Sequence, residues 1–231
     1  MKVLLWDIDG TLLNTDRAGL CAWMEAAEEI HGAPLDASGL TMAGMTDPHI
    51  ADITVDELMA RSGEADIAPR LLARYAELLP KWLPRRDNGF VHTNVLATLD
   101  AVANAPDYEH ALLTGNLEVG GRYKLAHYDI LDYFAWGAFA DGLPIRRDIA
   151  RKARAEAELR HGPDVELFVI GDTPHDIDCG HAVGARTIAL GTGRFSAAEL
   201  QGHDPWWAIE QLPPPAEFIA RLDTVQNRSG V

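Results

Sequence analysis

The sequence is poor in the residues that mark several classes of protein. Its 231 residues include two cysteines, Cys21 and Cys179, which lie far apart and match no zinc-binding spacing, so we expect ordinary buried thiols. Basic residues are outnumbered, because 20 Lys and Arg stand against 35 Asp and Glu and the net charge is −15. This balance argues against nucleic acid and against an anionic membrane surface as partners.

Long apolar runs are also missing. The first apolar run is short and ends in acid, which is unlike a signal peptide, and no stretch approaches the ~20 residues of a membrane span. Together with the low cysteine content, this predicts a cytoplasmic protein without a membrane partner. A hydrophobic fraction of 47% is still enough for a full core, in one large domain or two modest ones.

The chain is organised around residues 2–13, KVLLWDIDGTLL. Residues 3–6 are apolar, which suits a strand buried on both faces of a parallel sheet. The run stops at Asp7 and Asp9, and ligands of open α/β sheets bind at this end of a strand. The alternative is that the two acids only form a turn. Two acids two residues apart, followed by Gly-Thr, favour a site.

Each residue of this segment suits a chemical role. Asp7 can attack phosphorus or ligate a cation, and Asp9 can exchange protons with a leaving group. Gly10 allows a tight turn, and Thr11 offers an N–H and a hydroxyl to a phosphate.

The rest of the chain divides into two kinds of pattern. Helical spacing over residues 18–30, 48–61 and 67–79, followed by breaks at Pro80 and Pro84, predicts a small all-helical cap over residues 15–89. Strands and helices alternate after that, so residues 1–14 and 90–231 are expected to form an α/β core around a parallel sheet with right-handed crossovers.

Two later strands of the expected sheet also finish in polar segments that contain glycine. The strand at 110–113 ends in Thr114-Gly115-Asn116, where a hydroxyl and exposed N–H groups can hold a phosphate or simply cap the next helix. The strand at 166–170 ends in GDTPHD, which contains Asp172 and Asp176. In a parallel sheet all these ends face the same side, so the segments are expected to form one site.

Four carboxylates around one point would repel one another strongly unless a cation lay among them. Asp7, Asp9, Asp172 and Asp176 therefore predict a hard divalent ion with oxygen ligands, best Mg²⁺. His175 lies between the last two acids, but a transition-metal site would need more than one imidazole, so it is expected to be a loop residue.

Lysine is scarce, with only Lys2, Lys81, Lys124 and Lys152. Lys124 falls in the helix expected after the Thr114 turn, where a flexible point charge can reach both a phosphate oxygen and Asp7. The alternative is a solvated helix lysine.

The order of these motifs resembles the haloacid dehalogenase superfamily of phosphotransferases. The resemblance spans the whole chain and implies a Rossmann-like core with a mobile helical cap. It implies that Asp7 is a nucleophile that forms an aspartyl-phosphate, and that Asp9 is the general acid/base and binds Mg²⁺ through its backbone carbonyl. It further implies that Thr114 holds the phosphoryl group, that Asp172 binds the metal, and that Asp176 supports the metal directly or through water.

One position departs from the family pattern. Many members carry a lysine in a Lys-Pro segment shortly before the last motif, but residues 141–148 of this chain, DGLPIRRD, contain none. The cationic role is therefore assigned to Lys124, with Arg147 as the second choice.

The resemblance also limits the range of possible activities. Dehalogenases of the superfamily lack the second acid of the first motif, whereas Asp9 is present, and the absence of lysine between Leu12 and Pro80 argues against phosphonate hydrolases that use a cap lysine. The chain looks most like the phosphoglycolate phosphatases. We therefore predict a Mg²⁺-dependent phosphatase of a small phosphorylated metabolite. The alternatives are a β-phosphoglucomutase-like phosphosugar mutase and a non-catalytic phosphate- or metal-binding regulatory module.

Substrate selection is expected in the cap. Residues 44–49, GMTDPH, form a polar loop that could reach the leaving group when the cap closes. An equally good interpretation is a helix start, with Thr46 or Asp47 as N-cap before Pro48.

Overall fold

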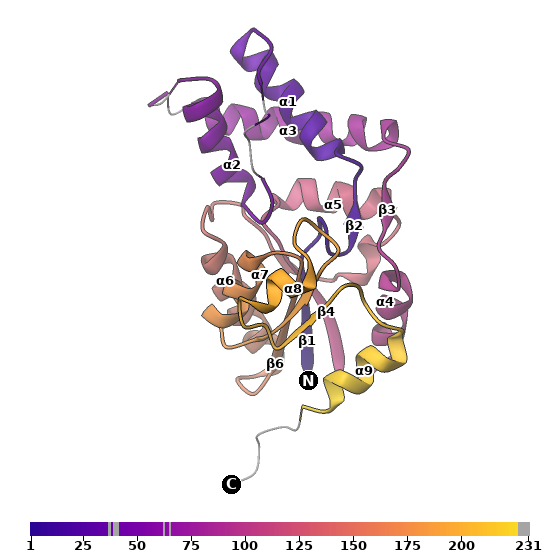
Figure 1. Ribbon diagram of the computed structural model, residues 1–231. Coiled ribbons are helices and arrows are strands. Elements are labelled where there is room, and N and C mark those ends of the chain that lie inside the picture. Colours follow the sequence, from indigo (N-terminus) through magenta and orange to yellow (C-terminus); the bar gives the residue numbers. More distant parts are fainter. Residues whose placement is uncertain (37, 39–41, 62, 65, 226–231) are drawn as a thin grey trace.

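The computed structural model describes residues 1–36, 38, 42–61, 63–64 and 66–225 of the chain. It has two parts: a core, in which helices flank a sheet, and a helical cap that lies over one edge of that sheet (Figure 1). The chain leaves the core after β2 (Leu13–Asn14) and returns through β3 (Phe90–Val91), and these two short strands pair antiparallel.

The core contains a six-stranded parallel sheet, which confirms the α/β fold. In spatial order its strands are β5 (Gly137–Ala138), β4 (Tyr108–Leu113), β1 (Lys2–Trp6), β6 (Glu166–Gly171), β7 (Arg186–Leu190) and β8 (Trp207–Ile209). The first strand of the sequence is central, since Leu4 pairs with His110 of β4 on one side and with Phe168 of β6 on the other.

Helices cover both faces of the sheet. Leu4 and Trp6 of β1 belong to the cluster that packs under α4 (Val95–Ala103), α5 (Glu118–His127) and α9 (Pro215–Asp223). Val3 and Leu5 point the other way, toward α6 (Arg146–His161) and α7 (Pro174–Ala182). Because successive side chains of a strand alternate between faces, a strand covered on both sides must be apolar throughout, as residues 3–6 are.

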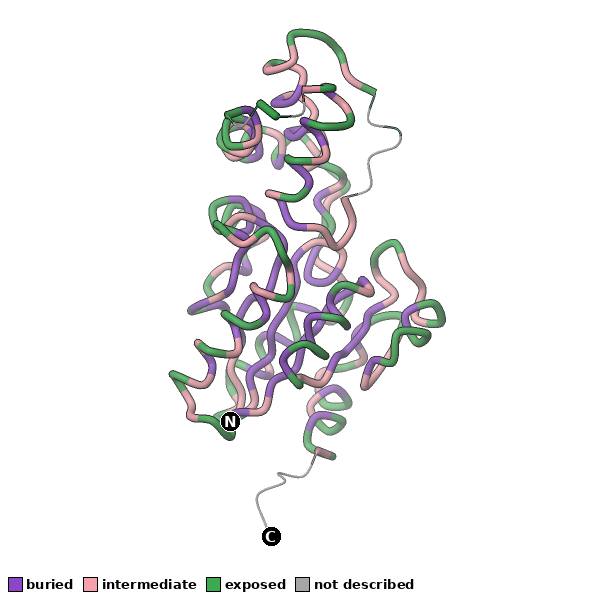
Figure 2. Tube along the Cα trace, turned by 90° about the vertical axis from the view of Figure 1, so that its left-hand side faces the viewer, coloured by how far each residue is buried: buried purple, intermediate pink, exposed green. Residues whose placement is uncertain are grey.

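The cap consists of α1 (Ala18–His31), α2 (Asp47–Ile53) with a following π-helical turn η1 (Thr54–Leu58), and α3 (Ile67–Trp82) with a 3₁₀ turn η2 (Leu83–Arg85). It has a hydrophobic cluster of its own, which includes Trp23 and Leu71. Buried residues therefore gather both in the core and, separately, among the cap helices (Figure 2).

Three details differ from the sequence prediction. Pro80 does not end the third cap helix, which continues to Trp82, since only one backbone hydrogen bond is lost and the ring lies at an exposed position in the last turn. The helix predicted over 48–61 is α2 followed by the π-helical turn. Finally, β8 was not predicted, because three residues close to Pro205 give too little pattern, and α8 (Ala197–Gln201) precedes it.

Among the helices of the described residues, none combines the length and the apolar composition that crossing a membrane requires.

Replacing Phe168 tests the packing of the sheet under its helices. Phe168 is fully buried on β6, with its ring centroid 5.7 Å from that of Trp206. We expect Phe168→Ala to lower the free energy of unfolding by about 3–5 kcal/mol, because it leaves a cavity in the core. Urea denaturation measures the loss. Leu159→Ala on α6 is the control, since Leu159 is 81% exposed and its change should stay within about 0.5 kcal/mol. Equal losses in both variants would contradict the packing described here.

Candidate active site

The carboxyl ends of three neighbouring strands, β4, β1 and β6, meet at the edge of the sheet that faces the cap. Thr114 follows β4, Asp7 follows β1 and Asp172 follows β6. The exposed fractions of Thr114, Asp7 and Asp172 are 1%, 5% and 4%, so all three polar residues are buried. The polar segments that follow these three strands therefore lie together at one site, as the sequence predicted.

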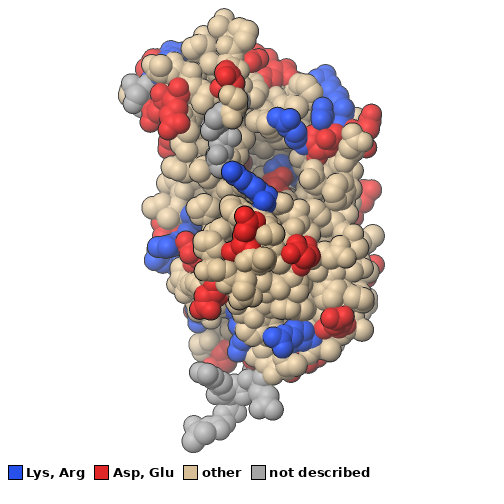
Figure 3. Space-filling view, viewed as in Figure 1, with Lys and Arg blue, Asp and Glu red and all other residues tan. Residues whose placement is uncertain are grey.

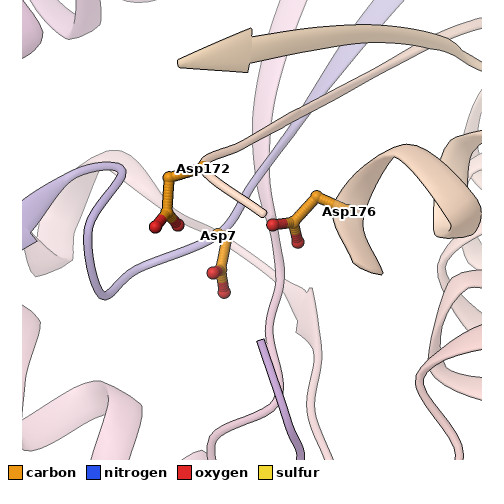
Figure 4. A group of neighbouring side chains, drawn as sticks. All are labelled: Asp7, Asp172 and Asp176. Atoms are coloured by element: carbon orange, nitrogen blue, oxygen red, sulfur yellow. The ribbon is translucent and has the colours of Figure 1, made fainter. Parts of the chain in front are cut away.

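Asp7, Asp172 and Asp176 form the acidic group of the site. Each offers a carboxylate oxygen, and these oxygens lie within 4.8 Å of one another. Figure 4 shows the three side chains turned toward a common point, from the end of β1, from the turn after β6 and from the start of α7. Burial raises the pKa of Asp7 to about 7 and that of Asp172 to about 8, and the charge of Asp176 adds to both shifts.

This group fits a hard divalent cation. Three buried carboxylates supply only oxygen ligands, and a cation among them would relieve the repulsion that, after burial, helps to raise the pKa values of Asp7 and Asp172. Asp176 already has protein partners on both oxygens, since Arg146 contacts one while the N–H (3.1 Å) and hydroxyl (2.6 Å) of Thr173 donate to the other. Asp7 and Asp172 therefore offer the more available ligand atoms, with Asp176 beside them.

The carboxylate of Asp9 lies outside the acidic group. Its Oδ2 accepts hydrogen bonds from Lys124 Nζ at 2.5 Å and from Asn116 Nδ2 at 3.0 Å. The prediction that four carboxylates surround one point is therefore wrong for the Asp9 side chain, because these two partners hold it. Asp9 still lines the same cavity as Asp7, in a position to exchange a proton with a group bound there.

Lys124 is a buried residue of the site and not a solvated helix lysine. Its Nζ donates to Asp9 and, at 2.7 Å, to Asn116 Oδ1. Burial works against its charge, but the carboxylates of Asp9 and Asp47 hold the pKa of Lys124 above its ordinary value. The ion pair of this lysine is thus with Asp9 rather than with Asp7, the partner named from the sequence.

The turn after β4 is fixed by its own side chains. Thr114 Oγ1 accepts from the N–H of Asn116 at 3.3 Å and from its Nδ2 at 2.8 Å. The hydroxyl of Thr114 also faces Asp7, where it lowers the pKa of that carboxyl and partly opposes the effect of burial. Thr114, Gly115 and Asn116 all line the cavity, so this turn can receive a phosphoryl group.

Gly10 and Thr11 lie against Asp172 of the acidic group. Gly10 has a φ of +81°, and a Cβ there would lie 2.5 Å from Asp172 Oδ2, so glycine is required on both counts. The Thr11 hydroxyl donates to Asp172 Oδ1 at 3.2 Å and its N–H donates to Ile8 O at 3.3 Å. The two groups of Thr11 assigned to phosphate from the sequence therefore have partners within the chain.

Arg146 is a site residue that the sequence interpretation missed. It begins α6, and its side chain is only 9% exposed. It contacts Asp176 and places Nη2 3.6 Å from Asp7 Oδ1. Although burial opposes its charge, Asp176 and Asp7 hold the pKa of Arg146 above its ordinary value. Arg147, the second choice for the cationic role, is exposed instead and pairs with Asp178 at 3.3 Å. Helical phase could have separated the two, because Arg146 lies three residues before Ile149 and seven before Ala153, on the buried face of α6.

A cavity of about 370 Å³ lies between the core and the cap. Figure 3 shows a hollow in this face of the molecule, where basic and acidic side chains lie close together. The core contributes the polar residues described above, and Arg194 at the rim. The cap side is largely apolar: Leu20, Met42, Ala43, Met45 and Ile50, with Thr15, Asp47 and Tyr75 as its polar members.

Comparison with known proteins gives a family. The model of haloacid dehalogenase-like hydrolases matches residues 4–181. Among curated proteins, the tyrosine-protein kinase PtkA of Mycobacterium tuberculosis (strain ATCC 25618 / H37Rv) is 26% identical over 200 residues, which cover 83% of this chain and 62% of PtkA. The chain thus spans less than two thirds of the length of this relative.

Solved structures share the fold at low identity. A predicted phosphatase from Clostridium acetobutylicum superimposes with a TM-score of 0.70 at 18% identity, over 97% of this chain and 99% of the other. A predicted phosphoglycolate phosphatase from Haemophilus somnus 129pt gives 0.68 at 16% identity, over 96% and 98%.

The raised pKa values predict how stability depends on pH. An unfolded aspartate has a pKa of about 3.9. Between that value and the folded-state values of about 7 for Asp7 and about 8 for Asp172, the folded chain binds more protons than the unfolded chain. We therefore expect these groups to lower the free energy of unfolding of the metal-free protein as the pH rises from about 4 to 8.

Urea unfolding in EDTA at pH 5.5 and pH 8 measures this effect, with Asp172→Asn as the reference that lacks one of the groups. The stability of the wild-type chain relative to Asp172→Asn should fall as the pH rises, and excess MgCl₂ should restore it more at pH 8 than at pH 5.5. A relative stability that rises with pH in EDTA would refute the assignment.

Proposed function

Since the chain belongs to the family of haloacid dehalogenase-like hydrolases, we propose that it hydrolyses a small phosphomonoester with the help of Mg²⁺. The observation that carries the proposal is the placement of Asp7. Its carboxylate lies at the cavity, with Arg146 on one side, the Thr114 hydroxyl on another, and two further carboxylates that can share a cation with it.

Two steps account for hydrolysis. In the first, an Asp7 oxygen forms a bond to phosphorus while the ester P–O bond breaks, and the leaving oxygen takes a proton from Asp9. In the second, Asp9 removes a proton from water, which attacks the aspartyl-phosphate and releases inorganic phosphate and the Asp7 carboxylate. Asp9 is suited to both transfers because it lines the cavity and its side chain is 43% exposed.

The chain supplies positive charge at both carboxylates. Arg146 lies beside Asp7 and can offset the repulsion between the nucleophile and the phosphate, while Lys124 holds Asp9. Asp7, Asp172 and, with its other partners, Asp176 would hold Mg²⁺, and the backbone carbonyl of Asp9 is a further ligand that we propose. When bound there, Mg²⁺ would neutralise charge on the phosphoryl oxygens.

A small substrate is favoured by the size of the cavity, about 370 Å³, part of which the phosphoryl group fills. For the cap above it we propose the bounds 15–89, with 1–14 and 90–231 as the core. The similarity in fold to a predicted phosphoglycolate phosphatase supports a phosphorylated metabolite of this general size, such as phosphoglycolate, a sugar phosphate or a nucleotide.

The nucleophile is tested by Asp7→Asn. The amide is nearly isosteric but a poor nucleophile, so we expect Mg²⁺-dependent hydrolysis of p-nitrophenyl phosphate to fall by roughly 10³-fold or more. Thermal unfolding of the variant checks that it is folded. Activity that survives the substitution would remove Asp7 from this role.

A panel of phosphoglycolate, sugar phosphates, nucleotides and pyrophosphate identifies the substrate by phosphate release. Isomerisation of a hexose 1-phosphate with a bisphosphate primer would instead indicate a mutase, which needs the same two aspartates. Transfer from ATP to a tyrosine-containing polymer tests the activity named for the mycobacterial relative. Binding of Mg²⁺ with no turnover in any assay would indicate a non-catalytic module.

Arg146 and Arg147 form a matched pair for testing the cationic role. We expect Arg146→Ala to reduce kcat/KM by about 100-fold, because it removes the charge beside Asp7. Arg147→Ala removes the same charge from an exposed neighbour and should change kcat/KM by less than about 2-fold. Comparable losses in the two variants would show that Arg146 acts only through the general charge of this segment. Arg146→Lys, which keeps a buried charge, separates catalysis from folding.

A further inference from the structure

Asp47 occupies an unusual position for an acidic residue in the first turn of a helix. Thr46 is the N-cap of α2, where its side chain accepts from the N–H of His49 at 3.3 Å, so the predicted helix start is confirmed. An aspartate next to such a cap usually points to solvent, where it favours the helix dipole. Here Asp47 is only 7% exposed, and its side chain reaches a different part of the chain.

Asp47 makes two hydrogen bonds to the core, both to the turn that follows β4. Its Oδ2 accepts from the N–H of Leu117 at 2.8 Å, and its own N–H donates to Gly115 O at 2.8 Å. One cap residue thus binds both sides of Asn116, about 70 positions away in the sequence. A buried hydrogen bond to a charged acceptor is among the stronger ones in proteins.

The surrounding contacts show that the cap and this turn fit together closely. The Thr46 hydroxyl donates to Pro144 O at 2.8 Å, in the segment that leads to Arg146. A Cβ on Gly115 would lie 2.2 Å from Met45 O, so the turn can approach the cap only because it has glycine there. Three successive cap residues, 45–47, therefore contact the core loops that contain Gly115 and Pro144, and both loops carry or lead to residues of the site.

The bonded turn also carries Thr114 and Asn116. Asn116 Nδ2 donates to both Thr114 Oγ1 and Asp9 Oδ2. Asn116 lies between Gly115 and Leu117 in the chain, so a displacement of either neighbour would also move Asn116. Asn116 is one of the two residues, with Lys124, that donate hydrogen bonds to the Asp9 carboxylate. The position of the cap and the position of Asp9 are thus joined through a short series of hydrogen bonds.

We infer that Asp47 is a positioning residue that couples closure of the cap to the placement of the turn at residues 114–117, and through Asn116 to Asp9. The inference rests on the proposed function, in which Thr114 receives the phosphoryl group and Asp9 transfers protons. Asp47 touches neither reacting atom. It acts by setting the turn when the cap is closed, so that the site is complete only in the closed form.

The test compares Asp47→Ala with Asp47→Asn and with Asp52→Ala. Asp52 is an exposed residue of the same helix, so its variant removes an equal charge without touching the turn. We expect Asp47→Ala to lower kcat by about 10- to 100-fold with p-nitrophenyl phosphate and Mg²⁺, because the turn is no longer held. Asp47→Asn should recover much of this loss, since its amide oxygen can still accept from Leu117, and Asp52→Ala should match the wild type.

Hydrogen–deuterium exchange of the full chain gives a readout that does not depend on turnover. Amides of residues 114–117 should exchange faster in Asp47→Ala than in Asp52→Ala, while those of β1 should not change. Unchanged exchange together with unchanged kcat would overturn the inference. A fall in kcat that Asp47→Asn does not rescue, with unchanged exchange, would also overturn it.

Two further outcomes separate the inference from the proposed function. If the wild-type chain hydrolyses no phosphoester, the proposed function fails, and exchange at residues 114–117 alone decides whether Asp47 holds the turn. If Asp47→Ala does not fold, Thr46→Val replaces it, since it removes the neighbouring bond to Pro144 together with the N-cap bond from His49. It should give a smaller change in the same direction in both readouts, and no change in either would count against the coupling.

Discussion

Repulsion among buried carboxylates is the constraint on which the rest of the structure depends. Asp7, Asp172 and Asp176 lie too close together, and too far from water, for all three to be ionised without nearby positive charge. Arg146 supplies one such charge from the start of α6, and the all-oxygen surroundings favour a divalent ion for the remainder. The strand order β4–β1–β6 and the glycine at position 10 bring these groups together.

Two basic side chains of the site, Arg146 and Lys124, contact different carboxylates. Arg146 serves the acidic group around Asp7, whereas Lys124 is committed to Asp9 and Asn116. In the proposed reaction, charge stabilisation at phosphorus and proton transfer at the leaving oxygen are therefore supported by different residues from different helices. The sequence had instead suggested a single lysine shared between Asp7 and the phosphate, whereas Lys124 pairs with Asp9.

The sequence predicted those features that depend on local pattern. The apolar run at residues 3–6, the polar strand ends and the helical spacing of the cap gave the fold and brought Asp7, Thr114 and Asp172 to one edge. The roles of Arg146 and Asp47 were not predicted, because they depend on which face of a helix meets a distant element. Helical phase favours Arg146 over Arg147 for the buried face of α6, but only tertiary packing shows that this face meets Asp7 and Asp176. In the same way, an aspartate at a helix start looks the same whether it faces water or Leu117.

The paired strands β2 and β3 have a consequence for how this architecture can change. Leu13 and Val91 are direct neighbours, so the chain leaves the core and re-enters it at one point. The conformational entropy lost in closing the core across that point rises only slowly with the length of chain inserted there. Under the proposed function, the insertion can therefore be lengthened or remodelled to admit another leaving group while the sheet keeps Asp7 and Asp172 in place, provided that the contacts of Asp47 with the turn at residues 114–117 are kept.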